Sequence, residues 1–197
     1  MALRTRTFLA AGGALAAALV MTGCGSGSAV SDDEKPETRA FALSGKTLTV
    51  DSDGSDIEIA PADVKELEVT RWFSGWTALG EDPKVTWGLD GGTLKLRTEC
   101  DALVSDCAVK HRIKVPRGVV VKVEDDNGAV VASGFDNKLT IRSDNGDVTV
   151  ELPRAAYKVT AESENGDVDV KVDRSESSAH VVTARSDSGE VTVRSAN

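Results

Sequence analysis

Apolar and polar residues alternate along three closely similar segments in the last third of the chain. The segments are 139–150 (LTIRSDNGDVTV), 159–170 (VTAESENGDVDV) and 182–193 (VTARSDSGEVTV), and they align without gaps. In each segment, two alternating runs flank a polar tip that contains Asn-Gly or Ser-Gly. Alternation of this kind is typical of half-buried β-strands, and a glycine at the tip permits a tight reversal of the chain. Each copy therefore predicts two short strands joined by a turn.

Looser copies extend the repeat toward the N-terminus, at residues 121–132 around Asn127-Gly128 and at residues 48–59. The tip glycines at positions 128, 146, 166 and 189 are 18, 20 and 23 residues apart. This period is too short for repeats of paired helices and suits a rung of two strands. The sequence thus predicts an all-β fold. Two architectures agree with it, a meander of hairpins and a single β-solenoid, similar to a parallel β-helix, with two-strand rungs of about 20 residues.

The outward positions of the aligned copies favour the β-solenoid. Stacking the copies in sequence order places Arg142, Glu162 and Arg185 in one column, so that the charge alternates from rung to rung. Neighbouring strands lie ~4.8 Å apart, a distance at which opposite charges attract across a ladder. A second outward column contains only threonine: Thr140, Thr160 and Thr183. We therefore expect one β-solenoid domain over residues 40–195.

The first 24 residues have the pattern of an export signal. Arg4 and Arg6 precede an apolar run at 8–21, which is too short to span a bilayer comfortably. Residues 20–24 (VMTGC) resemble the lipobox of bacterial lipoproteins, with Met21 where leucine is usual. The resemblance implies a signal peptide at 1–23 and acylation of Cys24, which would hold the protein at the extracytoplasmic face of the bacterial cell membrane. Residues 24–39 are rich in Gly, Ser and acidic residues, so we expect a lipidated N-terminus and flexible tether there.

The chain is acidic, with a net charge of −9 from 32 acidic and 23 basic residues. This balance argues against nucleic-acid binding, which requires a basic face. The acidic tips allow two interpretations. Asp144, Asp147 and Asp167 are weak candidates for calcium ligands, because a hard cation would relieve carboxylate repulsion. Asp and Asn are also good turn formers in solvent, and we favour this second interpretation, in which no cofactor binds.

Cys100 and Cys107 enclose the six residues DALVSD. Outside the cytoplasm, with Cys24 taken by lipid, these two thiols form an even pair. We predict a disulfide that closes this loop.

Four aromatic residues lie in the non-repetitive stretch 71–99: Trp72, Phe73, Trp76 and Trp87. Clustered aromatic residues bring large apolar area to a binding surface. They could equally cover one end of the stacked rungs, since an open stack needs a cap. We favour the cap and keep these residues as the candidate binding surface.

The sequence contains no phosphate-binding glycine loop, nucleophile elbow or Cys-His pair. His111 and His180 have no second metal-ligating residue at a suitable spacing, so we expect each to be a surface or strand residue. We assign no catalytic residues and expect no enzyme activity. The less favoured alternative is a carbohydrate-active enzyme that uses carboxylates such as Asp125 and Asp126.

The lipobox-like residues, the recurring Gly-Asp-Val-x-Val tips and the segment 113–121 (IKVPRGVVV) occur together in this chain. With them the sequence resembles the bacterial putative-adhesin family of β-strand-repeat domains, in its lipoprotein form, over residues 40–195. The resemblance implies a membrane-tethered β-solenoid with a surface binding role.

We therefore expect a lipid-anchored cell-surface protein that acts as a non-enzymatic scaffold or adhesin-like binding module. Its partners would be the membrane, through the anchor, and an unknown surface protein or a cell-wall glycan. Open strand edges at the solenoid ends could also support self-association. A calcium-dependent envelope protein is the alternative.

Overall fold

The computed structural model describes residue 30 and residues 34–196. The predicted signal peptide at 1–23 and the predicted lipidation residue Cys24 lie outside the described residues. Fifteen strands make up the regular structure of the described part. They are β1 (Glu37–Phe41), β2 (Thr47–Ser52), β3 (Asp56–Ala62), β4 (Leu67–Gly80), β5 (Lys84–Asp90), β6 (Thr93–Glu99), β7 (Ala102–Pro116), β8 (Val120–Asp125), β9 (Val130–Ser133), β10 (Leu139–Ser143), β11 (Val148–Leu152), β12 (Lys158–Ser163), β13 (Val168–Lys171), β14 (Val181–Ser186) and β15 (Val191–Ser195).

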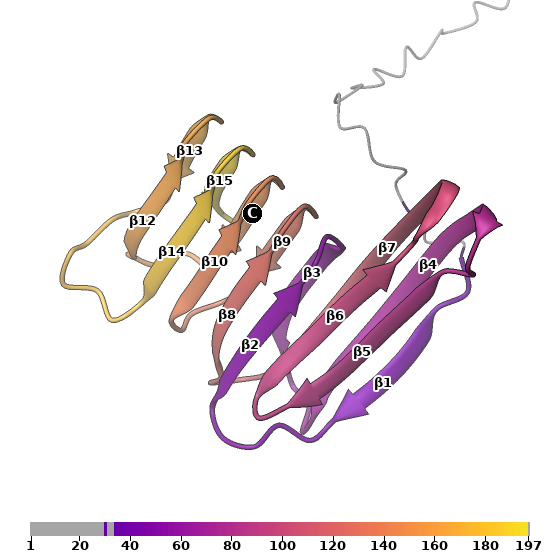
Figure 1. Ribbon diagram of the computed structural model, residues 1–197. Coiled ribbons are helices and arrows are strands. Elements are labelled where there is room, and N and C mark those ends of the chain that lie inside the picture. Colours follow the sequence, from indigo (N-terminus) through magenta and orange to yellow (C-terminus); the bar gives the residue numbers. More distant parts are fainter. Residues whose placement is uncertain (1–29, 31–33, 197) are drawn as a thin grey trace, which may run out of the picture.

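The strands form two sheets that face each other (Figure 1). One sheet has eight strands in the order β1-β4-β7-β3-β9-β11-β15-β13, and the other has seven in the order β12-β14-β10-β8-β2-β6-β5. Most neighbouring strands run parallel, and three pairs run antiparallel: β1 with β4, β4 with β7, and β5 with β6. The predicted all-β fold is confirmed, with two mixed and mostly parallel sheets.

Each repeated segment contributes its first strand to one sheet and its second strand to the other. In β10, Leu139 and Ile141 are fully buried, whereas the alternating residues Thr140 and Arg142 face outward. Val148 and Val150 of β11 point inward in the same way from the opposite sheet. The inward valines, leucines and isoleucines of both sheets form one continuous core. Burial of each such side chain stabilises the fold by roughly 1.5–3 kcal/mol.

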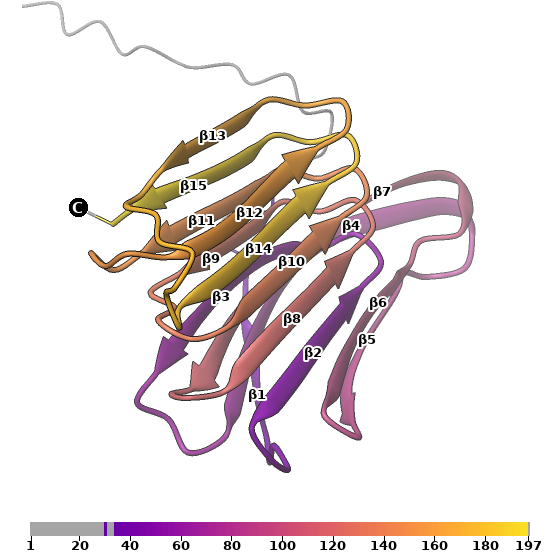
Figure 2. The same ribbon diagram turned by 90° about the vertical axis from the view of Figure 1, so that its left-hand side faces the viewer.

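The order of the copies in space differs from their order in sequence. The last pair, β14 and β15, lies between β10/β11 and β12/β13 (Figure 2). Arg142 is therefore a neighbour of Arg185, and Arg185 is a neighbour of Glu162. The predicted alternation of charge is wrong at the first of these contacts. Arg142 is instead compensated by Asp187, at 3.4 Å, and Arg185 by Glu162, at 2.9 Å.

The threonine positions do form one column, in the spatial order Thr140, Thr183, Thr160. The chain achieves the exchange of copies with two connections outside the repeat. Residues 153–157 connect β11 to β12, which skips the adjacent rung position. Residues 172–180 then connect β13 to β14, which occupies the skipped position. Five extended residues span up to about 17 Å, enough to cross two inter-strand spacings of ~4.8 Å each.

The turns between paired strands stack closely on one another. The N–H of Gly146 donates to Ser143 Oγ at 2.8 Å, and Gly166 and Gly189 make the same bond with Ser163 and Ser186. A side chain at Gly146 would meet the carbonyl oxygen of Gly128, because an added Cβ would lie only 1.8 Å from that atom. The turn requires glycine here because neighbouring copies approach so closely.

The two ends of the stack are built differently. At one end β6 and β7 continue the parallel ladders, and β5, β4 and β1 follow as antiparallel strands. At the other end β12 and β13 are the outermost strands. Glu37–Arg39, which the sequence placed in the tether, are paired in β1 with β4. Regular structure therefore begins three residues before the predicted domain boundary.

Candidate functional site

At the antiparallel end of the stack, two long strands extend sideways past the turns of the rungs as an arm (Figures 1 and 2). β4 and β7 pair antiparallel from Glu68↔Lys114 to Gly80↔Ala102. The neighbouring pairings stop earlier, β1 at Arg71 and β3 at Lys110. Beyond these positions, β4 and β7 pair only with each other among the described strands. We call residues 73–80 and 102–109 the arm.

Apolar side chains are exposed near the end of this arm. Their exposed fractions are 54% for Trp76, 84% for Leu79, 81% for Leu103 and 50% for Val104. Ala78 lies opposite Val104, so Trp76 and Val104 are diagonal neighbours on one face of the arm. We call these four residues the arm tip. They include four of the six large hydrophobic side chains that are exposed in the described part of the chain.

A disulfide fastens the arm to the body. Cys100 and Cys107 are joined, with their Cα atoms 6.4 Å apart, which confirms the predicted bond. Cys107 lies in β7 directly opposite Gly75. A Cβ at Gly75 would lie 2.7 Å from the Phe73 ring and 3.0 Å from the Cys107 sulfur, so the arm packs tightly at this point.

Acidic side chains surround the arm tip. Glu81, Asp82, Asp101 and Asp106 are all exposed, and Lys84 forms an ion pair with Glu81 at 2.6 Å. The pairing with Lys84 holds the pKa of the Glu81 carboxyl below its ordinary value. The arm tip therefore exposes apolar side chains within a predominantly acidic margin, with Leu103 and Val104 on opposite faces of β7.

The four aromatic side chains predicted as a candidate surface do not form one surface. Trp72 and Trp87 are buried, with exposed fractions of 6% and 7%. Trp72 lies under the guanidinium of Arg112, 4.9 Å from its ring centre. Phe73 is half-buried, and only Trp76 reaches the arm tip.

The indole of Trp87 packs between cations inside the antiparallel end of the stack. The guanidinium carbons of Arg39 and Arg71 lie 4.7 and 5.0 Å from its ring centre. Phe41 meets the same ring edge-on at 6.2 Å. Trp87 thus joins β1, β4 and β5 and is not accessible to a partner.

Three of the arm-tip residues, Leu79, Leu103 and Val104, were missed by the sequence reasoning. One sequence signal could have found two of them. Leu103 and Val104 are adjacent, so a strand must turn one of them away from any single core. They also lie between Asp101 and Asp106 in the segment closed by the disulfide.

The acidic turns hold no metal-binding group. No set of three or more His, Cys, Asp or Glu side chains in the described part of the chain could hold a metal ion. Asp144 lies 3.8 Å from Arg142, and Asp147 Oδ1 accepts a hydrogen bond from the Glu190 N–H at 2.8 Å. Asp167 is exposed. The calcium hypothesis therefore gains no support from the geometry.

Asp125 occupies a turn position that serine fills in the other copies. It lies beside Ser52 on one side and Ser143 on the other, and it is only 3% exposed. One oxygen accepts a hydrogen bond from the Gly128 N–H. The other, Oδ1, has no hydrogen-bond partner within the described structure. Burial raises the pKa of Asp125 from 3.8 to about 6, and hydrogen bonds from Ser52 and Gly128 only partly oppose this.

His111 lies in the strand β7 and is fully buried, which agrees with the expectation of a surface or strand residue through its second alternative. Its Nδ1 lies 3.0 Å from Ser55 Oγ, which in turn lies 2.9 Å from Ser52 Oγ. Burial and the charge of Arg71 lower the pKa of His111 to about 3. The ring is therefore neutral at physiological pH. It ends a chain of buried polar groups that begins at Asp125.

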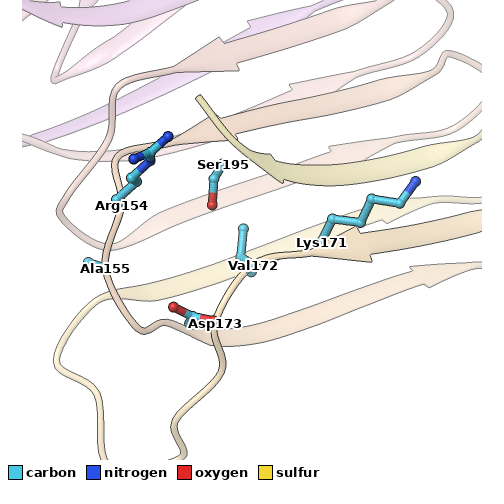
Figure 3. A pocket seen from close by; sticks show the side chains of 6 residues that line it. All are labelled: Arg154, Ala155, Lys171, Val172, Asp173 and Ser195. Carbon is cyan, nitrogen blue, oxygen red and sulfur yellow. The ribbon is translucent and has the colours of Figure 1, made fainter. Parts of the chain in front are cut away.

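A shallow pocket lies at the end of the stack remote from the arm (Figure 3). Its volume is about 400 Å³, and it is lined by Arg154, Ala155, Lys171, Val172, Asp173 and Ser195. The lining mixes charged and small side chains.

Part of the chain matches a known family. Residues 117–197, which include β8 to β15, match the model of the family described as Toastrack DUF4097. No curated protein matches the sequence.

Two crystal structures resemble the fold. One is a "putative cell adhesion protein" from Clostridium sporogenes, with 13% sequence identity and a TM-score of 0.50, covering 82% of this chain and 99% of that one. The other is a "putative lipid binding protein" from Parabacteroides distasonis, with 16% identity and a TM-score of 0.47, covering 83% and 68%. At such identities the likeness concerns the fold alone. Within the described residues, no helix is long and apolar enough to cross a membrane.

Proposed function

We propose that this protein is a lipid-anchored, non-enzymatic binding module of the bacterial cell surface, with the arm tip as its binding surface. The exposed apolar side chains at the end of a disulfide-fastened arm are the observation that carries the proposal. Exposed apolar patches on soluble proteins commonly mark interaction sites. The similar structure named as a "putative cell adhesion protein" fits such a role.

The body that carries the arm is a β-solenoid in this proposal. Equivalent turn residues of five copies lie side by side in register: Ser52, Asp125, Ser143, Ser186 and Ser163. A stack of this kind is rigid because each rung is hydrogen-bonded to the next. It can therefore present the arm at a fixed distance from its point of attachment.

The proposed anchor would attach at the end of the molecule that carries the arm. β1 runs antiparallel to β4, so its first residue, Glu37, lies beside Arg71 at the base of the arm. Thirteen positions separate Glu37 from Cys24, and a Gly/Ser-rich segment of this length spans about 20 Å. The eight arm residues of β4 extend about 25 Å. In this proposal, the arm tip therefore lies close to the membrane surface.

The chemistry of the arm tip favours a protein partner over the bilayer. Bacterial membranes carry anionic lipids, which repel an acidic margin. An apolar surface bordered by Lys or Arg, on the extracytoplasmic part of a membrane protein, would complement both the apolar residues and the carboxylates around them. A cell-wall glycan offers less apolar area to Leu79, Leu103 and Val104.

The anchor is tested by replacing Cys24 with serine in the full chain and following acylation with an alkyne-labelled fatty acid. The unchanged protein should incorporate the label and remain in the membrane fraction. The Cys24→Ser variant should do neither. Equal labelling of the two proteins would refute lipidation at Cys24.

The binding surface is tested by placing a photo-crosslinking amino acid at Leu103 of the full chain in intact cells. Val131, which is 37% exposed on β9 in the middle of a sheet, is the matched control position. A discrete adduct with a membrane protein at Leu103, absent at Val131, is expected. Adducts that a cell-wall hydrolase removes would indicate a glycan instead, and identical products at both positions would refute the arm tip.

A further inference from the structure

The end of the stack opposite the arm exposes the core. β12 and β13 are its last strands, and no antiparallel strands follow them among the residues that the structure describes. Val159, Ala161, Val170 and Val172 pack against the core but are only partly buried. Val168 is 43% exposed, whereas the equivalent Val191 and Val148 of inner rungs are fully buried. This end is the place where a further rung would fit.

Backbone groups of β12 also point to the outside. The Lys158 N–H donates to the His180 carbonyl on the inner side, at 2.9 Å. Because successive residues of a strand direct their backbone groups to opposite edges, Val159 and Ala161 direct theirs outward. Among the residues that the structure describes, backbone pairing covers this outer edge at Tyr157, whose N–H donates to the Asp173 carbonyl and whose carbonyl accepts from the Ser175 N–H.

Backbone groups of β13 point outward as well. The Val191 N–H of the inner strand β15 donates to the Asp167 carbonyl, at 2.9 Å. Val168 and Val170 therefore direct their N–H and C=O groups outward. Two strands, one in each sheet, thus offer open edges at the same end of the molecule, and such edges readily pair with another strand.

The charges on these two edges determine which strand fits. β12 has Lys158 at its start and Glu162 near its end, and β13 has Asp169 before Lys171. A second copy added in parallel would place like charges side by side. An antiparallel copy brings the basic end of each strand to the acidic end of the other. With Val170 opposite its own counterpart, Asp169 faces Lys171 of the second copy.

We propose that two molecules associate end to end, with β12 and β13 of one pairing antiparallel with β12 and β13 of a second copy. The interface is two-fold symmetric, so it closes at a dimer. It makes both sheets continuous, extends the core through the half-buried valines, and covers the pocket beside Lys171 and Val172. Because antiparallel pairing reverses every strand, the two arms leave the dimer on opposite sides.

The dimer is tested on the full chain in detergent micelles by sedimentation equilibrium and by cross-linking. Wild-type protein should have twice the chain mass. Val170→Asp puts a carboxylate at the two-fold axis and should reduce the measured mass to that of one chain. Val131→Asp, on the central strand β9, should leave the dimer intact. A circular-dichroism melt checks that Val170→Asp remains folded.

Cross-linking does not depend on the stability of the aspartate variant. A short bismaleimide should link Val170→Cys into a covalent dimer and leave the parent protein and Val131→Cys as single chains. A wild-type protein that stays monomeric at 100 µM (on the order of ten times a weak Kd of 10 µM) would overturn the proposal. Equal cross-linking of Val170→Cys and Val131→Cys would overturn it as well.

Discussion

Replacement of Gly146 by alanine probes the close stacking of the turns. The new Cβ would lie 1.8 Å from the Gly128 carbonyl oxygen, whereas a real Cβ keeps at least 3.0 Å from such an atom. The two copies must therefore separate locally by more than 1 Å. Hydrogen bonds on the N-terminal side of the glycine join the same copies, from Asp144 N to Asp125 O at 3.0 Å and from Asn145 N to Asp126 O at 2.9 Å.

The expected loss of stability follows from these contacts. Overpacking of a rigid site costs about 1–3 kcal/mol, and weakening two backbone hydrogen bonds costs about 1 kcal/mol each. Gly146→Ala should therefore lower the free energy of unfolding by about 3–5 kcal/mol. Most of the neighbouring atoms are backbone, so rotation of a side chain cannot relieve the contact.

Gly88→Ala is the matched control. Gly88 lies in β5, its φ is not positive, and no heavy atom lies within 4 Å of an added Cβ. Alanine there should be neutral or stabilise by up to about 1 kcal/mol, because glycine loses more conformational entropy on folding. Urea unfolding of both variants at pH 7 gives the two free energies. If Gly146→Ala unfolded at the same urea concentration as Gly88→Ala, the described stacking of the turns would be wrong.

Three further changes have defined outcomes. Asp125 binds its proton more tightly in the folded state, so its contribution to stability should be lost as pH rises from about 4 to 6. Relative to wild type, Asp125→Ser should therefore gain stability over this range and be more stable at pH 7.5 by up to about 3 kcal/mol, as measured by urea unfolding across pH. His111 has the opposite pH effect and is common to both proteins, so their difference isolates Asp125. Replacing Cys100 and Cys107 by serine should cost about 2–3 kcal/mol and increase proteolysis of the arm first, which limited proteolysis would detect. Tyr157→Phe, which removes the 3.1 Å bond to the Pro153 carbonyl, should lower the melting temperature by an amount equivalent to about 1 kcal/mol, and an unchanged melt would show that the bond contributes nothing.

The alternation of the repeats was sufficient to predict the strands and the turns between them, because it is a local property of each copy. It could not predict their order in space. The inward residues Leu139, Val159 and Val182 are similar in shape, so any copy can pack on any other. The order depends on the connections at 153–157 and 172–180, whose sequences show no repeat.

The candidate site was only partly predictable for a related reason. The disulfide follows from the number of cysteines, but the exposure of Leu103 depends on how far β7 extends beyond β3. The burial of Trp87 depends on Arg39 and Arg71, which come from strands distant in sequence. Contacts of this kind are set by the three-dimensional fold and leave no local pattern.

The stacking order of the copies is tested most directly by pairs of introduced cysteines. Thr140 and Thr183 are register neighbours, and Thr160 lies on the far side of Thr183. The pair Thr140→Cys/Thr183→Cys should be linked by a reagent that spans one strand spacing of ~4.8 Å, and Thr140→Cys/Thr160→Cys, two spacings apart, should not. Cross-linking of the 140/160 pair without the 140/183 pair would show that the copies stack in sequence order and would contradict the architecture described above.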